Sequence, residues 1–196
     1  MKKLFLALVM ITLAACAPST LSTPENTLVA PVTDAPTESP TAQGNGCPAE
    51  TAGMKLLINE ENGYCLLYSA DHSVILPHLI VINPVNAPGD VPGEAWAEIV
   101  MEPASGHTAA QVADAQIAEW GEGFGITRSE ILVDGQQAIV VDGLPGPDSQ
   151  RKVFVVSNER LYTLAFLPWF PSNDPSQPTP LENLYATIVG TIHFLP

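Results

Sequence analysis

Positive charge is scarce in this chain of 196 residues. Seven Lys and Arg residues stand against 21 Asp and Glu, which gives a formal net charge of −14 with histidine neutral. A surface of this sign repels the phosphate backbone of nucleic acids and the headgroups of anionic lipids. The composition therefore excludes nucleic acid as a partner, and it leaves open a cationic ligand or an acidic exterior that serves solubility.

Long apolar runs are absent as well. The run "LFLALVMITL", residues 4–13, is well short of the roughly 20 residues that a membrane-spanning helix needs. Two lysines precede it and two alanines follow it, which is the layout of a secretory signal peptide. Residues 1–15 are therefore predicted to be a signal peptide.

Cysteine is rare too, and the first of the three is Cys16. It ends the stretch "LAAC", which resembles the lipobox of bacterial lipoproteins. In that family the chain is cleaved before the cysteine, and acyl chains, palmitate among them, are attached to it. The resemblance implies that Cys16 is lipidated and anchors the protein to the outer face of a bacterial membrane. The alternative is an ordinary signal peptide followed by a chance cysteine.

The other two cysteines, Cys47 and Cys65, form an even pair in a chain with an export signal. Such pairs tend to oxidise outside the cytosol. The sequence therefore predicts a Cys47–Cys65 disulfide, with two separate thiols as the alternative.

Between the lipobox and this pair the chain lacks aromatic residues, Lys and Arg, and it is rich in Pro, Ser and Thr. Such a segment has too little apolar area to offset the entropy of ordering. Residues 16–46 are therefore predicted to be a disordered tether behind the lipidated cysteine. The remaining residues, 47–196, have the length of one domain.

Strand and helix patterns begin at Met54. Alternating apolar residues and turn signals predict strands, and two capping boxes, at Thr108 and Thr179, predict the starts of helices. The predicted strands cover 54–58, 64–70, 78–83, 95–101, 126–133, 136–143, 151–157 and 160–167. This order predicts an α+β domain, an antiparallel β-sheet of about six to seven strands with two main helices packed on it.

The stretch "ENGYCLLYSADHS", residues 61–73, resembles the opening hairpin of the PsbP-like fold. That fold is named for an extrinsic photosystem II protein and also occurs in exported bacterial lipoproteins. The resemblance covers residues 54–196 and extends to the order of elements and the closing amphipathic helix, although Ser69 stands where the family usually has Pro. It implies an α/β/α sandwich, and its members are often accessory or assembly factors.

Motifs of catalysis and metal binding are missing from the sequence. It contains no HxxH, HExxH or G-x-S-x-G. The stretch "GEGFG" at 121–125 follows a predicted helix, whereas a dinucleotide-binding loop follows a strand. His72 and His78 share one predicted loop, and Asp142 and Asp148 flank a loop without the EF-hand pattern. The sequence predicts no enzyme, no cofactor and no metal site.

Aromatic residues gather at one place, in "PWFPSNDPSQP", residues 168–178. Trp169 and Phe170 either fill the rim of the core or form an exposed patch that binds a partner. Because aromatic residues anchor interfaces, Trp169 is predicted to contribute to any contact with a protein partner in the cell envelope.

Together these features predict a membrane-anchored extracytoplasmic lipoprotein with a non-catalytic binding or accessory domain. The alternatives are an extracytoplasmic hydrolase with an unrecognised site and a small solute-binding lipoprotein.

Overall fold

The computed structural model describes residues 46–82, 95–121, 124–146 and 149–196. The predicted signal peptide, Cys16 and all of the tether except Gly46 lie outside the described residues, so these remain predictions. No helix in the described part of the chain is long and apolar enough to cross a membrane.

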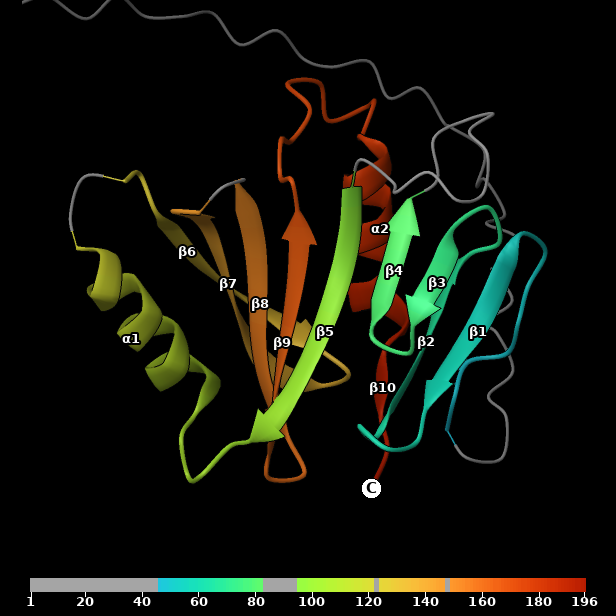
Figure 1. Ribbon diagram of the computed structural model, residues 1–196, viewed down its shortest axis with the longest axis horizontal. Helices are drawn as coiled ribbons and strands as arrows, with labels where there is room; N and C mark the ends of the chain where they lie inside the picture. Colours follow the sequence, from blue (N-terminus) through green and yellow to red (C-terminus); the bar gives the residue numbers. More distant parts are fainter. Residues whose placement is uncertain (1–45, 83–94, 122–123, 147–148) are drawn as a thin grey trace, which may run out of the picture. The chain divides into compact units, whose positions relative to one another are not determined.

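The described residues form strands and two helices in an order close to the predicted one (Figure 1). The elements are β1 (Met54–Asn59), β2 (Tyr64–Ser69), β3 (Ser73–Leu76), β4 (Leu79–Ile82), β5 (Ala95–Pro103), α1 (Ala109–Trp120), β6 (Thr127–Val133), β7 (Gln136–Leu144), β8 (Gln150–Ser157), β9 (Arg160–Leu167), α2 (Pro180–Thr191) and β10 (His193–Phe194). Two of the strands, β3 and β10, were not predicted.

The strands form two antiparallel sheets where one was predicted. A seven-stranded sheet has the order β3-β4-β5-β9-β8-β7-β6, and a three-stranded sheet has the order β1-β2-β10. The single-sheet prediction is wrong because the first hairpin does not join the edge of the large sheet. Its residues Tyr64 and Leu66 are fully buried in one cluster with Ile80 and Ile99 of the large sheet, so the hairpin stacks on the face of that sheet.

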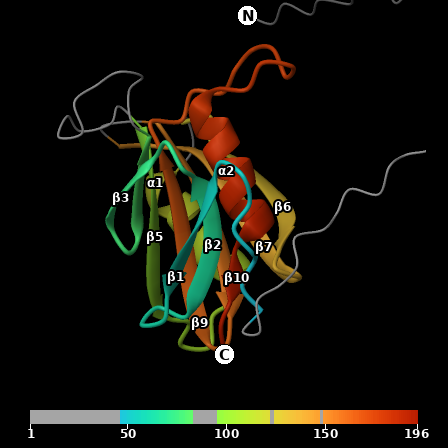
Figure 2. The same ribbon diagram turned by 90° about the vertical axis from the view of Figure 1, so that its right-hand side faces the viewer.

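At β7 the large sheet is covered on both faces, as the alternation of its residues shows. Ile139 and Val141 belong to the core beneath α1, whereas Ala138 and Val140 belong to the core beneath α2. Figure 1 shows α1 on one side of the large sheet, and Figure 2 shows α2 together with the small sheet on the other. The predicted antiparallel α+β architecture with two helices is confirmed.

Local signals in the sequence match the structure closely. Thr108 accepts the backbone N–H of Gln111 at 3.2 Å, and the Gln111 side chain accepts the Thr108 N–H at 2.9 Å. Thr179 and Glu182 form the same reciprocal pair, at 3.2 and 2.7 Å. These two capping boxes fix where α1 and α2 begin.

Candidate functional site

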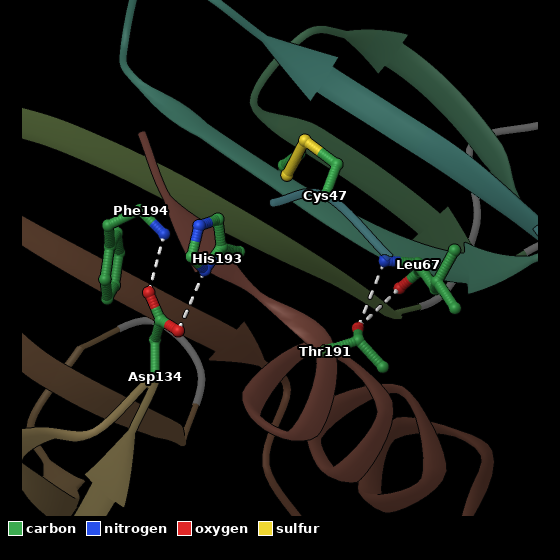
Figure 3. Close-up of a disulfide and its surroundings, with 7 residues drawn as sticks. Cys47, Leu67, Asp134, Thr191, His193 and Phe194 are labelled. Carbon is green, nitrogen blue, oxygen red and sulfur yellow. Dashed lines mark hydrogen bonds and ion pairs between the residues drawn. A yellow bond between two sulfur atoms is a disulfide. The ribbon is translucent and has the colours of Figure 1, made fainter. Parts of the chain in front are cut away.

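The predicted disulfide between Cys47 and Cys65 is present in the structure (Figure 3). Both cysteines are fully buried, and their Cα atoms are 5.8 Å apart. Because Cys65 lies in the centre of the small sheet, the bond fixes the beginning of the domain to β2.

Beside this disulfide the end of the chain is held by Asp134, a residue of the β6–β7 turn. Its Oδ1 lies 3.0 Å from Nδ1 of His193, and its Oδ2 accepts the backbone N–H of Phe194 at 2.9 Å (Figure 3). Asp134 and Gly135 have φ values of 49° and 73°, the left-handed conformations that a two-residue hairpin turn requires. One carboxylate therefore links a turn of the large sheet to β10 of the small one.

The structure separates the two interpretations of Trp169 and Phe170. Trp169 is only 5% exposed, and its ring packs 5.5 Å from Tyr185 and 6.4 Å from Phe166, measured between ring centroids. The exposed-patch interpretation is therefore wrong for Trp169, and the alternative interpretation, a side chain at the rim of the core, holds. Phe170 is 67% exposed, and a binding role for it stays a prediction.

Arg151 completes the surroundings of Trp169. Its guanidinium carbon lies 4.0 Å from the centre of the Trp169 ring and 4.6 Å from that of Tyr185. The same guanidinium donates to both carboxylate oxygens of Asp142, at 2.7 and 2.6 Å. Asp142 is therefore paired with a cation, and Asp148, the other acidic residue flanking that loop, lies outside the described residues.

The histidines are not brought together. His72 precedes β3 and His78 follows it, so they lie at opposite ends of the β3–β4 hairpin, in contrast to the shared loop that was predicted. Within residues 46–82, 95–121, 124–146 and 149–196, no group of three or more His, Cys, Asp or Glu is placed to hold a metal ion.

His72 does line a cavity of about 280 Å³ between the β2–β3 turn and the first half of α2. Its side chain is 11% exposed, and its Nδ1 lies 3.1 Å from Oδ1 of Asp71. Burial lowers the pKa of His72, and the neighbouring Asp71 carboxylate opposes that shift. A hydrogen bond from Ser69 lowers the pKa of Asp71. A neutral imidazole beside a carboxylate can accept a proton, but the Ser69 hydroxyl is bound to the carboxylate and not to the imidazole.

His72 should make the stability of the protein depend on pH. Because its pKa is lower in the folded than in the unfolded state, the unfolded state binds more protons as the pH falls from about 6.5, the usual histidine pKa. The stabilisation is complete above that pH and is lost as the pH falls through the folded pKa. We expect His72→Gln to flatten the decrease in unfolding free energy over this range, measured by urea denaturation at a series of pH values. An unchanged slope would contradict the assignment.

A partly exposed surface lies on the large sheet, on the side that carries α1. That helix packs on β7 and β8 and against Leu161 at the start of β9, and in the described part of the chain no helix lies over β4 or β5 on this side (Figure 1). We call this surface the open face. It consists of Leu79, Trp96, Glu98, Val100 and Leu167, which the strand register places close together. Val100 is exposed and the other four are half-buried, whereas Val81 and Ala165 lie in the same rows and are buried.

Charge is distributed unevenly over the open face. Glu98 lies between Trp96 and Val100 on β5, directly between Leu79 and Ala165 of the neighbouring strands. Lys152 is next in that row, and its ammonium donates to Gln116 of α1 at 3.3 Å. Burial lowers the pKa of Lys152, and the carboxylates of Glu119 and Glu98 oppose that shift. The alternation in "AWAEIVM" puts Trp96, Glu98 and Val100 on one face of a strand, but it does not show that α1 leaves that face open.

The fold and this surface define an acidic, disulfide-bonded α+β domain with an open sheet face. No protein-family model matches the sequence, and no curated protein matches it. By structure, the chain is similar to cyanobacterial PsbP from Synechocystis sp. PCC 6803, known from a solution structure. The two share 14% sequence identity with a TM-score of 0.39, over 79% of this chain and 97% of that chain. At this identity and TM-score the likeness carries no argument about function.

Proposed function

We propose that this protein is an exported lipoprotein, held on the outer face of a bacterial membrane by acyl chains on Cys16, whose domain binds a protein partner in the cell envelope. The observation that carries the proposal is the buried Cys47–Cys65 disulfide. Disulfides form and persist in exported proteins and are rare in the cytosol. The bond therefore supports export independently of the signal-like N-terminus.

A binding role is supported by the character of the open face. It offers apolar side chains beside carboxylates on neighbouring strands, and surfaces of this kind occur where proteins meet. The charge of −14 supports a protein partner over nucleic acid or an anionic membrane surface. The accessory or assembly role implied by the PsbP-like resemblance belongs to this proposal.

Changing Cys16 to Ser should release the protein from membranes. Each buried CH₂ of an acyl chain contributes about 0.8 kcal/mol to membrane binding, and stable attachment needs more than one chain. We therefore expect the wild-type chain in the membrane fraction and Cys16→Ser in the soluble fraction after lysis and sedimentation. Mass spectrometry of the N-terminal peptide should show an acylated cysteine in the wild type.

The matched control is the double variant Cys47→Ser/Cys65→Ser, which makes the same chemical change away from the lipobox and should stay with the membrane. If Cys16→Ser sediments with the membrane as completely as the wild type, the anchoring proposal is wrong.

A further inference from the structure

The open face presents apolar surface that the rest of the described chain leaves uncovered. Val100 at one end of it is 47% exposed, and Trp96, Leu79 and Leu167 in the rest of it are half-buried. Apolar area on adjacent strands remains in contact with water unless another molecule covers it. The surface is continuous because the strand register places Trp96 beside Leu167 and Val100 beside Thr163.

Negative charge dominates this surface. Glu98 lies within it, the exposed Glu102 lies at the end of β5, and Glu119 of α1 lies along one side. Lys152 is the cation of the same row, and it is held between α1 and the sheet by its contact with Gln116. Its charge is balanced locally by Glu98 and Glu119. The carboxylates outnumber the cation, so the open face attracts positive charge.

The spacing of the side chains is regular along β5. Trp96, Glu98 and Val100 alternate as apolar, acidic and apolar, with about 6.8 Å between neighbours, since alternate residues of a strand are two rises of about 3.4 Å apart. An extended peptide repeats its side chains at the same interval on one face. A segment whose face alternates apolar and basic residues therefore matches the open face in both spacing and charge.

We propose that the open face is the binding surface for an extended partner segment in which basic and apolar side chains alternate along one face. Its Lys or Arg residues pair with Glu98 and Glu102, and its apolar residues cover Trp96 and Val100. This inference rests on the proposed function as a binding domain, and it names the chemistry of the partner.

Charge argues against the other occupants of such a surface. A second copy of this chain, joined by a two-fold axis, would bring Glu98 and Glu102 close to the same residues of its partner, and like charges in an interface are costly. Anionic lipid headgroups would meet the same carboxylates. A basic segment is the occupant whose binding these carboxylates would favour.

The test uses the full chain and three short synthetic peptides, with binding measured by calorimetry at low and high salt. One peptide repeats Leu-Leu-Lys-Lys, so that Leu and Lys alternate on each face when it is extended. The second replaces Leu with Ser, and the third replaces Lys with Glu. We expect the Leu-Leu-Lys-Lys peptide alone to bind well, and added salt to weaken its binding.

Two pairs of variants locate the binding. Glu98→Gln/Glu102→Gln should weaken binding of the Leu-Leu-Lys-Lys peptide roughly threefold to tenfold, as expected for one half-buried and one exposed ion pair. Glu60→Gln/Glu61→Gln removes the same charge from the exposed β1–β2 turn and should leave affinity within about twofold, because exposed charges beyond a Debye length are screened. Val100→Asn should weaken binding, whereas Leu132→Asn on β6, where Leu132 is 72% exposed, should not.

If the two double glutamate variants lose equal affinity for the Leu-Leu-Lys-Lys peptide, the attraction is nonspecific to an acidic protein and the inference is wrong. Failure of the Leu-Leu-Lys-Lys peptide to bind, or preference for the Ser or Glu peptide, would also overturn it. A dimer in sedimentation that Val100→Asn dissociates would assign the face to a second copy, and binding to anionic vesicles through Val100 would assign it to lipid. None of these results changes the fractionation of Cys16→Ser, so anchoring is judged separately.

Discussion

Replacing Trp169 with alanine should lower the free energy of unfolding by about 3–5 kcal/mol, the usual cost of emptying a buried aromatic site. Trp169 is 5% exposed and packs against Phe166 and Tyr185. The truncation also removes the ring on which the Arg151 guanidinium lies. Since small domains have only about 5–15 kcal/mol of stability, the loss is a large share of the total. Urea denaturation of the full chain, followed by far-ultraviolet circular dichroism, measures it.

Phe170 supplies the matched control, because it is the adjacent aromatic residue and is 67% exposed. Phe170→Ala should change the unfolding free energy by no more than about 0.5 kcal/mol, as is usual at exposed positions. If Trp169→Ala unfolds at the same urea concentration as the wild type, Trp169 is not part of the core. The exposed-patch interpretation would then apply to it again.

The parts of the fold that the sequence predicts well are those decided by neighbouring residues. Thr108 and Gln111 are three residues apart, so a capping box can be recognised from the sequence and is present in the structure. The same holds for the turn at Asp134 and Gly135, whose residue types suit positive φ. The two strands on either side of such a turn can then be predicted from the alternation of apolar and polar residues.

Features decided by distant residues were not predictable in this way. Asp134 contacts His193 and Phe194, which are 59 and 60 residues further along the chain, and no local pattern marks that contact. β10 has only two residues, too few for any periodicity. The direction in which Trp169 points depends on Tyr185 of α2 and on Arg151 of β8, so the sequence alone left its role open.

The candidate site was predictable in part. The alternation of Trp96, Glu98 and Val100 shows that these residues share one face of a strand, and the structure agrees. Which face of the sheet a helix covers depends on how α1 docks after its loop, and that is set by the small buried residues Ala109 and Ala113 against β7 and β8. The alternation of residues along a strand shows which side chains share a face. It does not show whether another helix or strand packs on that face.

Removing the disulfide should cost about 3 kcal/mol of stability, the value that the chain-entropy model gives for a loop of roughly this length. The bond joins residues with a sequence separation of 18, and both cysteines are fully buried. The double variant Cys47→Ala/Cys65→Ala keeps small apolar side chains at both positions, so the lost cross-link dominates the change. Urea denaturation of the full-length variant and of the wild type under oxidising conditions gives the difference.

The location of the bond adds a local expectation. Cys65 is paired with His193 across β2 and β10, and Cys47 is joined to Cys65, so the start and the end of the domain meet at this strand. Without the bond, the amide of Phe194 should exchange hydrogen faster than amides in the centre of β8. Adding reductant to unfolded wild type should reproduce the loss of stability, and the double variant should not respond to reductant. A wild type that is equally stable with and without reductant would show that the cross-link contributes nothing, and the stabilisation argued from loop closure would be wrong.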